Sequence, residues 1–292
     1  MPPPVSSSVQ AARQRLADQL KEFRQDAGLT GRELARRAGW TSGVAKVSRI
    51  EHAHRPISAE DLRTWCRVCE VPEQRTAELL AELRTVASMW ESHAQAARAG
   101  LKRVQESIRD DYEQVTLHHV YQTKVIPGLL QTEALTTAYL TRSRIEQHIA
   151  VDDVAEAVQE RMKRQRCLHR PDARWLFVLE EAVLRYRSAS DEVHVQQLRH
   201  LLTMMRWPTI SLGIIPTQAR RHGVCPEESF TMFDARLVLV ELVSGYLSVT
   251  HPAEVRLYVE AWERLFKLAV HGDAARRLIS RALKSIDQGT DG

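Results

Sequence analysis

The chain has 292 residues, of which 43% are apolar and 27% are charged, with 12 glycines and 11 prolines. This composition excludes disordered, collagen-like and disulfide-scaffold proteins, and the length suffices for two domains at about 100–200 residues each. The net charge of +4 lies in residues 1–75, which hold 13 Lys and Arg against 9 Asp and Glu. A basic module joined to a neutral body is typical of a nucleic-acid reader, although a solvated surface explains so small a charge equally well.

The sequence also indicates a compartment. No segment approaches the roughly 18 uninterrupted apolar residues of a membrane span, and the first ten residues lack the features of a signal peptide. Four cysteines in so long a chain suit a reducing environment: Cys66, Cys69, Cys167 and Cys225. We therefore expect a cytoplasmic protein without structural disulfides or membrane contact.

The first quarter of the chain predicts short helices. Three prolines and three serines make residues 1–10 a predicted flexible tail. Apolar residues recur at helical spacing over 11–26, and Thr30 then begins a second helix through a capping box with Glu33. A third helical segment follows, and two more are expected at about 58–69 and 76–90.

Beyond residue 75 the pattern changes. An alanine- and glutamate-rich stretch predicts a helical connector over 76–115. Strands are then expected near 117–125, 175–180, 209–216, 229–233 and 237–242, among helices near 152–169, 193–205, 253–270 and 274–286. The expected fold is therefore multidomain, with an all-α domain over 11–75 and an α+β domain over 116–292.

Residues 30–51 carry the most specific pattern. A helix-turn-helix requires a small residue where its helices cross, a glycine at the turn, and two apolar residues that seat the second helix. Ala35, Gly39, Val47 and Ile50 meet these requirements in order. Two ordinary amphipathic helices would show the same residues, but five short helices in a basic segment favour the helix-turn-helix.

Two stretches resemble known families. The sequence LTGRELARRAGW, with KVSRIE and RPISAEDLRTWCRVCEVP after it, resembles the Cro/repressor-type (XRE-type) helix-turn-helix, most specifically at 47–51. The rest resembles the carboxyl domain of actinobacterial regulators related to WhiJ, at IPGLLQTEA (126–134), RMKRQ (161–165), LEEAVLR (179–185), QLRHL (197–201), ISLGIIP (210–216), SF (229–230) and VELVSGY (240–246). This resemblance implies a transcriptional regulator or an antitoxin-like partner, often encoded beside a very small protein that it binds.

The sequence departs from the repressor-type pattern at two points. About two additional residues precede Lys46, so an insertion lies in the turn or at the amino end of the recognition helix. Gly31 also stands where the family often has Gln, a side chain that reaches the DNA backbone. The base preference of the family therefore does not transfer to this chain.

A helical projection assigns candidate DNA-binding residues. With Val47 and Ile50 inward, Arg49 is the best candidate for a base edge or phosphate, because its planar fork can bind either through two hydrogen bonds. Lys46, at the flank, is predicted to meet phosphate as a point charge. The whole set comprises Arg32, Arg36, Ser42, Ala45, Lys46, Ser48 and Arg49. An ordinary solvated face is the alternative for Arg32 and Arg36.

Other patterns favour neither a metal nor catalysis. Cys66 and Cys69 lie three residues apart on a predicted helix, at positions that are core in repressor-type domains, and a zinc site needs two more ligands. Glu180 and Glu181 are adjacent and so do not form a glycosidase pair. The sequence contains no P-loop, GxGxxG, GxSxG or HExxH pattern. We expect no enzyme, no catalytic residue, no cofactor and no metal.

The segment IPGLLQTEA has two interpretations. Leu129, Leu130 and Ala134 lie at helical spacing after a Pro-Gly turn, which suggests the amino terminus of a helix packed on the core. The alternative is the floor of a groove for a partner or ligand, made by Pro127, Gly128, Leu129, Leu130 and Gln131.

Together these observations predict a sequence-specific, double-stranded DNA-binding transcriptional regulator. Its carboxyl domain is expected to form a homodimer and to bind a small protein encoded nearby. Two alternatives remain: an antitoxin-like sequestering protein whose DNA binding is autoregulatory, and a regulator that senses a small molecule in an apolar pocket of the α+β domain.

Overall fold

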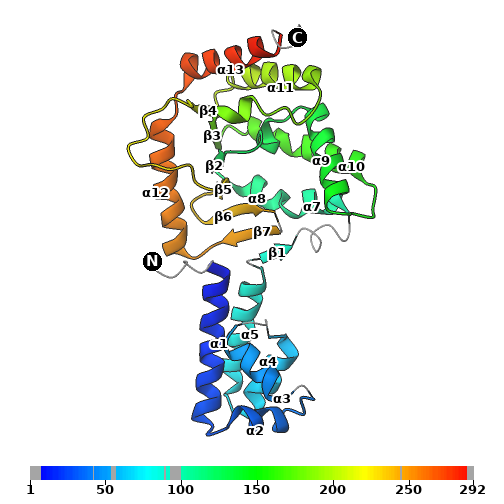
Figure 1. Ribbon diagram of the computed structural model, residues 1–292, viewed down its shortest axis with the longest axis vertical. Coiled ribbons are helices and arrows are strands. Elements are labelled where there is room, and N and C mark those ends of the chain that lie inside the picture. Colours follow the sequence, from blue (N-terminus) through cyan, green and yellow to red (C-terminus); the bar gives the residue numbers. More distant parts are fainter. Residues whose placement is uncertain are drawn as a thin grey trace. The chain divides into compact units, whose positions relative to one another are not determined.

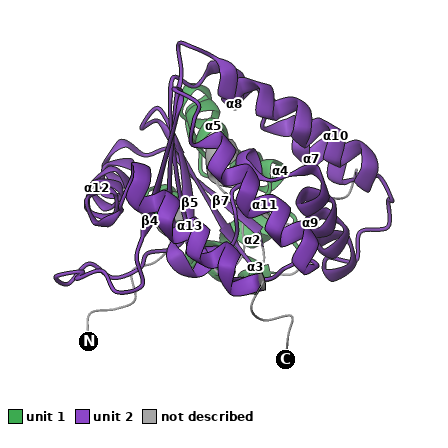
Figure 2. Ribbon diagram, turned by 90° about the horizontal axis from the view of Figure 1, so that it is seen from above, with its two compact units in different colours: residues 1–91 green, residues 92–292 purple. Residues whose placement is uncertain are grey.

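The computed structural model describes residues 8–41, 43–53, 57–88, 90–92, 100–243 and 245–287. The chain divides into two compact units, residues 1–91 and 92–292 (Figures 1 and 2). Unit 1 is helical, and unit 2 combines a mixed sheet with helices, so the predicted fold class is confirmed. Over the described residues, no helix is both long enough and apolar enough to cross a membrane.

Unit 1 contains five helices among its described residues: α1 (Ser8–Asp26), α2 (Gly31–Arg37), α3 (Gly43–Glu51), α4 (Ala59–Val68) and α5 (Glu73–Ser88). The predicted capping box is confirmed, because Thr30 Oγ1 accepts from the Glu33 amide at 3.2 Å and a Glu33 carboxylate oxygen accepts from the Thr30 amide at 2.8 Å. Helix α1 begins three residues inside the predicted tail, whose residues 1–7 lie outside the described part of the chain.

The core of unit 1 corrects one predicted boundary. Leu20, Leu34, Leu62, Trp65 and Leu79 are fully buried in one cluster. Because Leu79 belongs to α5, this helix completes the first domain and is not part of a connector. The predicted connector 76–115 is therefore divided between the two units, since the helices at its far end belong to unit 2.

Those far helices are α7 (Leu101–Ser107) and α8 (Arg109–Gln114). Leu101 is buried against side chains of α9 (Glu133–Glu146) and α10 (Val154–Arg164), which anchors α7 in unit 2. Leu79 and Leu101 each pack in the core of a different unit, but both stand in a polar, alanine-rich stretch of sequence. The sequence pattern therefore gave no sign of the two packing contacts.

The sheet has the strand order β1-β7-β6-β5-β2-β3-β4. Three strands, β2 (Leu117–Gln122), β3 (Arg174–Glu180) and β4 (Ile210–Ile215), are parallel. They are followed by an antiparallel meander of β5 (Phe230–Phe233), β6 (Leu237–Leu242) and β7 (Gly245–Val249), with β5 antiparallel to β2. The short strand β1 (Trp90–Ser92) lies at the boundary between the units. The sequence predicted every strand from β2 to β6 and missed β1 and β7.

Helices cover both faces of this sheet. Helix α12 (Pro252–Leu268) packs on one face, and α9, α11 (Asp191–Met204) and α13 (Gly272–Asp287) pack on the other (Figure 2). Side chains of β3 alternate between the two cores, with Trp175, Phe177 and Leu179 toward α11 and α13, and Val178 toward α12. Burial on both sides explains why β3 and β4 are almost continuously apolar.

Between β2 and α9 the chain makes the short 3-10 turn η2 (Gly128–Leu130). Helix α9 begins only at Glu133, with Thr132 as its N-cap. The segment IPGLLQ is therefore not the first turn of an α-helix, as its spacing suggested, but a separate tight turn before one.

Candidate nucleic-acid interface

Helix α3 is seated by the two apolar residues that the sequence identified. Val47 and Ile50 are 1% and 3% exposed and lie in the core of unit 1. Gly31, the first residue of α2, lies against Val47, because a Cβ at Gly31 would be 3.4 Å from Val47 Cγ1. The two helices thus approach closely at the position where the family often has Gln.

The predicted insertion lies in the turn and leaves the helices intact. Helix α2 ends at Arg37 and α3 begins at Gly43. Gly39 and Gly43 have φ of +69° and +54°, in the left-handed region that glycine tolerates best. Trp40 anchors the longer turn, with its ring 5.9 Å from that of Trp65. Sequence reasoning missed this residue, although a tryptophan beside the turn glycine was a usable signal.

The outward side of α3 carries three of the candidate residues. Ala45, Ser48 and Arg49 are exposed, and Ser42 lies outside the described residues. Arg49 Nε donates to the carbonyl of Ala45 at 3.0 Å, so the side chain lies along the surface of α3. Val44, which the sequence analysis did not identify, is 46% exposed and adds an apolar group of the kind that contacts a thymine methyl.

Lys46 makes contacts within unit 1 that the sequence did not predict. Its ammonium forms an ion pair with Asp61 of α4 at 2.6 Å and lies 4.3 Å from the centre of the Trp40 ring. The side chain is only 14% exposed. Lys46 therefore links α3 to α4 and to the turn. The sequence predicted a contact with DNA phosphate, but in the structure the ammonium is paired with Asp61.

A second buried ion pair fixes the other end of α3. Arg24 Nε lies 2.5 Å from one oxygen of Glu51, and Arg24 Nη2 donates to the other at 3.1 Å. Arg24 Nη1 also donates to the carbonyl of Leu29 at 2.7 Å. The hydrogen bond that Arg24 donates to Glu51 raises the pKa of Arg24 above its ordinary value. Both ends of α3 are thus held by charged contacts that sequence reasoning did not pair.

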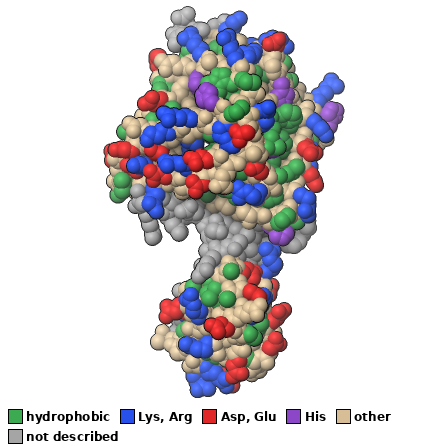
Figure 3. All heavy atoms as spheres, turned by 180° about the vertical axis from the view of Figure 1, so that it is seen from behind, with side chains coloured by type: hydrophobic (Ala, Val, Ile, Leu, Met, Phe, Trp, Pro, Cys, Tyr) green, Lys and Arg blue, Asp and Glu red, His purple; other side chains and the backbone are tan. Residues whose placement is uncertain are grey.

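Helix α2 exposes its basic residues. Arg32 and Arg36 are both exposed. Lys and Arg side chains gather at the end of unit 1, with acidic ones beside them (Figure 3). The Glu33 carboxylate occupies the amino end of α2, and its hydrogen bonds with Thr30 lower the pKa of Glu33. A phosphate at this end would have to compete with Glu33 for the Thr30 amide.

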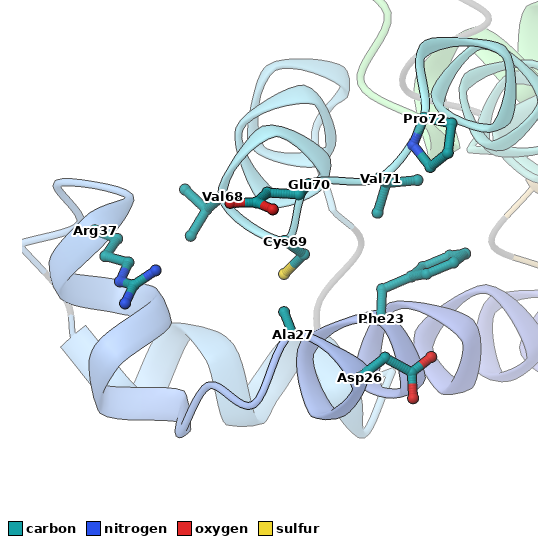
Figure 4. Close-up of a pocket in the computed structure, with 9 residues that line it drawn as sticks. All are labelled: Phe23, Asp26, Ala27, Arg37, Val68, Cys69, Glu70, Val71 and Pro72. Atoms are coloured by element: carbon teal, nitrogen blue, oxygen red, sulfur yellow. The ribbon is translucent and has the colours of Figure 1, made fainter.

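The two cysteines of the C-R-V-C pattern are core residues. Cys66 and Cys69 are free, 1% and 8% exposed, and belong to the apolar cluster of unit 1. Burial raises the pKa of Cys69 to about 11, so its thiol stays protonated at neutral pH. Its sulfur faces a hollow of about 300 Å³ at the carboxyl ends of α1, α2 and α4 (Figure 4). Across the described ranges, no group of three or more potential metal ligands comes together.

The IPGLLQ segment of unit 2 is packed in the core. Leu129, Leu130 and Gln131 are 4%, 0% and 3% exposed, Pro127 is buried and Gly128 is half-buried. These five residues therefore do not form the open floor of a groove, because their side chains are already covered by their own domain. The first interpretation of the segment, core packing, agrees with this burial.

Comparison with known proteins assigns both units to families. Residues 15–79 match the family described as a helix-turn-helix domain, and residues 113–281 match the family described as a domain of unknown function (DUF5753). No curated protein matches the chain. A solved structure of TrmBL2, an archaeal chromatin protein described as showing a novel mode of DNA binding, is 12% identical. The alignment covers 88% of this chain and 100% of that one, and its TM-score of 0.31 is too low to indicate a shared fold. The match to the domain of unknown function covers more than half of the 292 residues, so the chain belongs to the DUF5753 family. It carries a helix-turn-helix domain at its amino end.

Proposed function

We propose that this protein is a sequence-specific DNA-binding transcriptional regulator in which α3 is the recognition helix. The observation that carries the proposal is the two-sided character of α3. Val47 and Ile50 are buried, and Ala45, Ser48 and Arg49 face outward beside the exposed Val44. A helix of this kind, presented after a tight turn, is the element that enters the major groove in helix-turn-helix proteins.

The contacts of α3 support a revised division of roles. Arg49 is the proposed base-reading residue, because it is exposed and its guanidinium can bind guanine in a bidentate way. Lys46 and Glu51 are proposed to act indirectly, by fixing the angle of α3 against α4 and α1 through their ion pairs. Arg32 and Arg36 remain proposed phosphate contacts on α2.

Self-association of the protein is assigned to unit 2. One helix-turn-helix reads one half-site, so useful affinity generally requires two copies about one DNA turn apart. Exposed large apolar side chains are concentrated in unit 2, where Val243 is 98% and Leu257 is 62% exposed. Among the residues of unit 1 whose side-chain exposure is described, 13–41, 43–53 and 57–83, Val44 is the single such side chain, and it lies on the proposed DNA face.

Unit 2 is also proposed to bind a small protein partner. This part of the proposal rests on the resemblance to WhiJ-related regulators. The antitoxin-like alternative predicts a stoichiometric polypeptide whose release accompanies a change in DNA binding. Purification from the native cell followed by mass spectrometry of the complex tests this proposal, and a protein that carries no bound polypeptide contradicts it.

DNA titrations test the role of α3. Chromatin immunoprecipitation first supplies the operator, and purified protein is then titrated against that duplex and a scrambled one. Arg49→Ala should weaken operator binding by about 1–3 kcal/mol while changing scrambled binding little. Arg63→Ala, which removes the same charge from an exposed position on α4, is the matched control.

Two results would count against the proposal. Equal operator preference in Arg49→Ala and wild type would remove Arg49 from base reading. A full-length protein that sediments as a monomer at micromolar concentration, both free and on the operator, would contradict the paired arrangement.

A further inference from the structure

Two arginines of unit 2 lie close together, and neither forms an ion pair with a described acidic residue. We propose that Arg161 and Arg164, held by Gln105 and Gln131, form a binding site for the phosphoryl group of a small molecule. The inference concerns unit 2 alone and does not rest on DNA binding by unit 1.

The two guanidinium groups are held by the same amide. Arg161 Nε donates to Gln105 Oε1 at 3.1 Å, and Arg164 Nη2 donates to the same oxygen at 2.7 Å. Arg164 Nη1 donates to the Gln105 carbonyl at 3.0 Å. Gln105 itself is 6% exposed. One buried, neutral side chain therefore keeps two like charges next to each other.

Acidic side chains do not neutralise this pair. Within the described ranges neither arginine takes part in an ion pair, since the nearby Glu160 is bound by Arg109 at 2.5 Å and Lys163 at 2.8 Å. Burial, with the charge of Arg164 second, lowers the pKa of Arg161 to about 10.

Burial likewise lowers the pKa of Arg164. The carboxylate of Glu241, on β6, offsets only part of this lowering of the Arg161 pKa. Two partly buried cations that lie side by side without a counterion are stabilised in their charged form when an anion binds between them.

The pair retains hydrogen-bond donors for a ligand. A guanidinium has five N–H groups, and Arg164 uses two of them in the bonds to Gln105. Arg164 Nε is buried without a partner among the described residues. Arg161 uses one donor on Gln105 and one on Gln131 Oε1, at 3.1 Å. Several donors thus remain on two forks, an arrangement suited to the three oxygens and double charge of a phosphoryl group.

The surrounding residues preform the site. Gln165 Nε2 donates to the carbonyls of Gly128 and Gln131, at 3.2 and 2.7 Å, and so joins α10 to the IPGLLQ turn. The Tyr112 ring lies beneath Arg164, 5.0 Å from its guanidinium carbon. A Cβ at Gly128 would lie 3.5 Å from Arg161 Nη1, so a larger side chain there would crowd the guanidinium. The two sequence motifs at 126–134 and 161–165 therefore meet at these arginines, which are half-buried.

Titration of the full-length protein with inorganic phosphate tests the proposal. Calorimetry and thermal unfolding are measured at constant ionic strength, with chloride as the balancing anion and acetate as a second ligand. Wild type should bind phosphate saturably with a rise in Tm. Arg161→Gln should weaken phosphate binding at least tenfold and raise the Tm of the ligand-free protein, because it removes one of two uncompensated cations.

The matched control is Arg166→Gln, an exposed arginine on the segment that follows α10, which should change phosphate affinity less than twofold. Absence of saturable phosphate binding, or equal losses in both variants, would overturn the proposal. Acetate binding as tight as phosphate binding would overturn the assignment to a phosphoryl group.

A second measurement does not depend on the folding of a variant. In wild-type protein labelled with ¹⁵N-arginine, the Arg164 Nε–H resonance should shift saturably with phosphate and remain unchanged with chloride. The resonance is assigned by its loss in Arg164→Lys. An Arg164 signal that does not respond to phosphate would refute the site even where Arg161→Gln fails to fold.

Discussion

The ion pair between Arg24 and Glu51 should dominate the electrostatic stability of unit 1. The two side chains are 13% and 8% exposed and share two hydrogen bonds, at 2.5 and 3.1 Å. Glu51→Ala leaves the Arg24 cation buried without its partner, and breaking such a pair costs about 3–5 kcal/mol. By contrast, Arg75 and Glu78 are 40% and 50% exposed, so Glu78→Ala should cost less than about 1 kcal/mol.

Hydrogen exchange of the full-length protein compares the stability losses of Glu51→Ala and Glu78→Ala in individual helices of unit 1. Peptides from α1 and α3 should lose protection by about 10²- to 4 × 10³-fold in Glu51→Ala, since each 1.4 kcal/mol corresponds to about tenfold. The double variant Arg24→Met with Glu51→Leu should recover most of the loss, because no buried charge remains unpaired. Equal protection in Glu51→Ala and Glu78→Ala would refute the argument, as would a double variant less stable than Glu51→Ala.

Two further predictions concern single side chains. Thr30→Ala removes the capping box of α2 and should destabilise unit 1 by about 1 kcal/mol, seen as faster exchange in α2, whereas Thr30→Ser should retain the cap. His118 is fully buried and both ring nitrogens lack a partner among the described residues; burial lowers its pKa to about 3. Between about pH 6.5 and 3 the unfolded chain then binds a proton that folded His118 does not, so the unfolding free energy falls with decreasing pH, by about 1.4 kcal/mol per unit. His118→Phe should reduce this slope in urea denaturation at pH 7 and 5, with the remainder due to His119, whose pKa burial lowers to about 4. The exposed His251→Gln should leave the slope unchanged, and equal slopes in His118→Phe and wild type would contradict the assignment.

Sequence alone determined the features whose signals are local. The Thr30 capping box spans four residues, and the apolar pair Val47 and Ile50 spans one helical turn, so both could be predicted without a partner element. The strands β3 and β4 were equally predictable, because burial on both faces leaves an uninterrupted apolar run. Strand β7 was missed because only its two end residues are fully buried, which leaves no alternating pattern.

Tertiary structure decided every feature that joins distant residues. Lys46 looked like a free cation on a helix flank until the fold placed Asp61 beside it, fifteen positions along the chain. The boundary at α5 depended on where Leu79 packs. The arginine pair shows the same limit, since Arg161 meets Gln105 and Gln131 across 56 and 30 positions. The counterion of a charged residue cannot be predicted from the local sequence, because its desolvation and pairing depend on the side chains that the folded chain brings within a few ångströms.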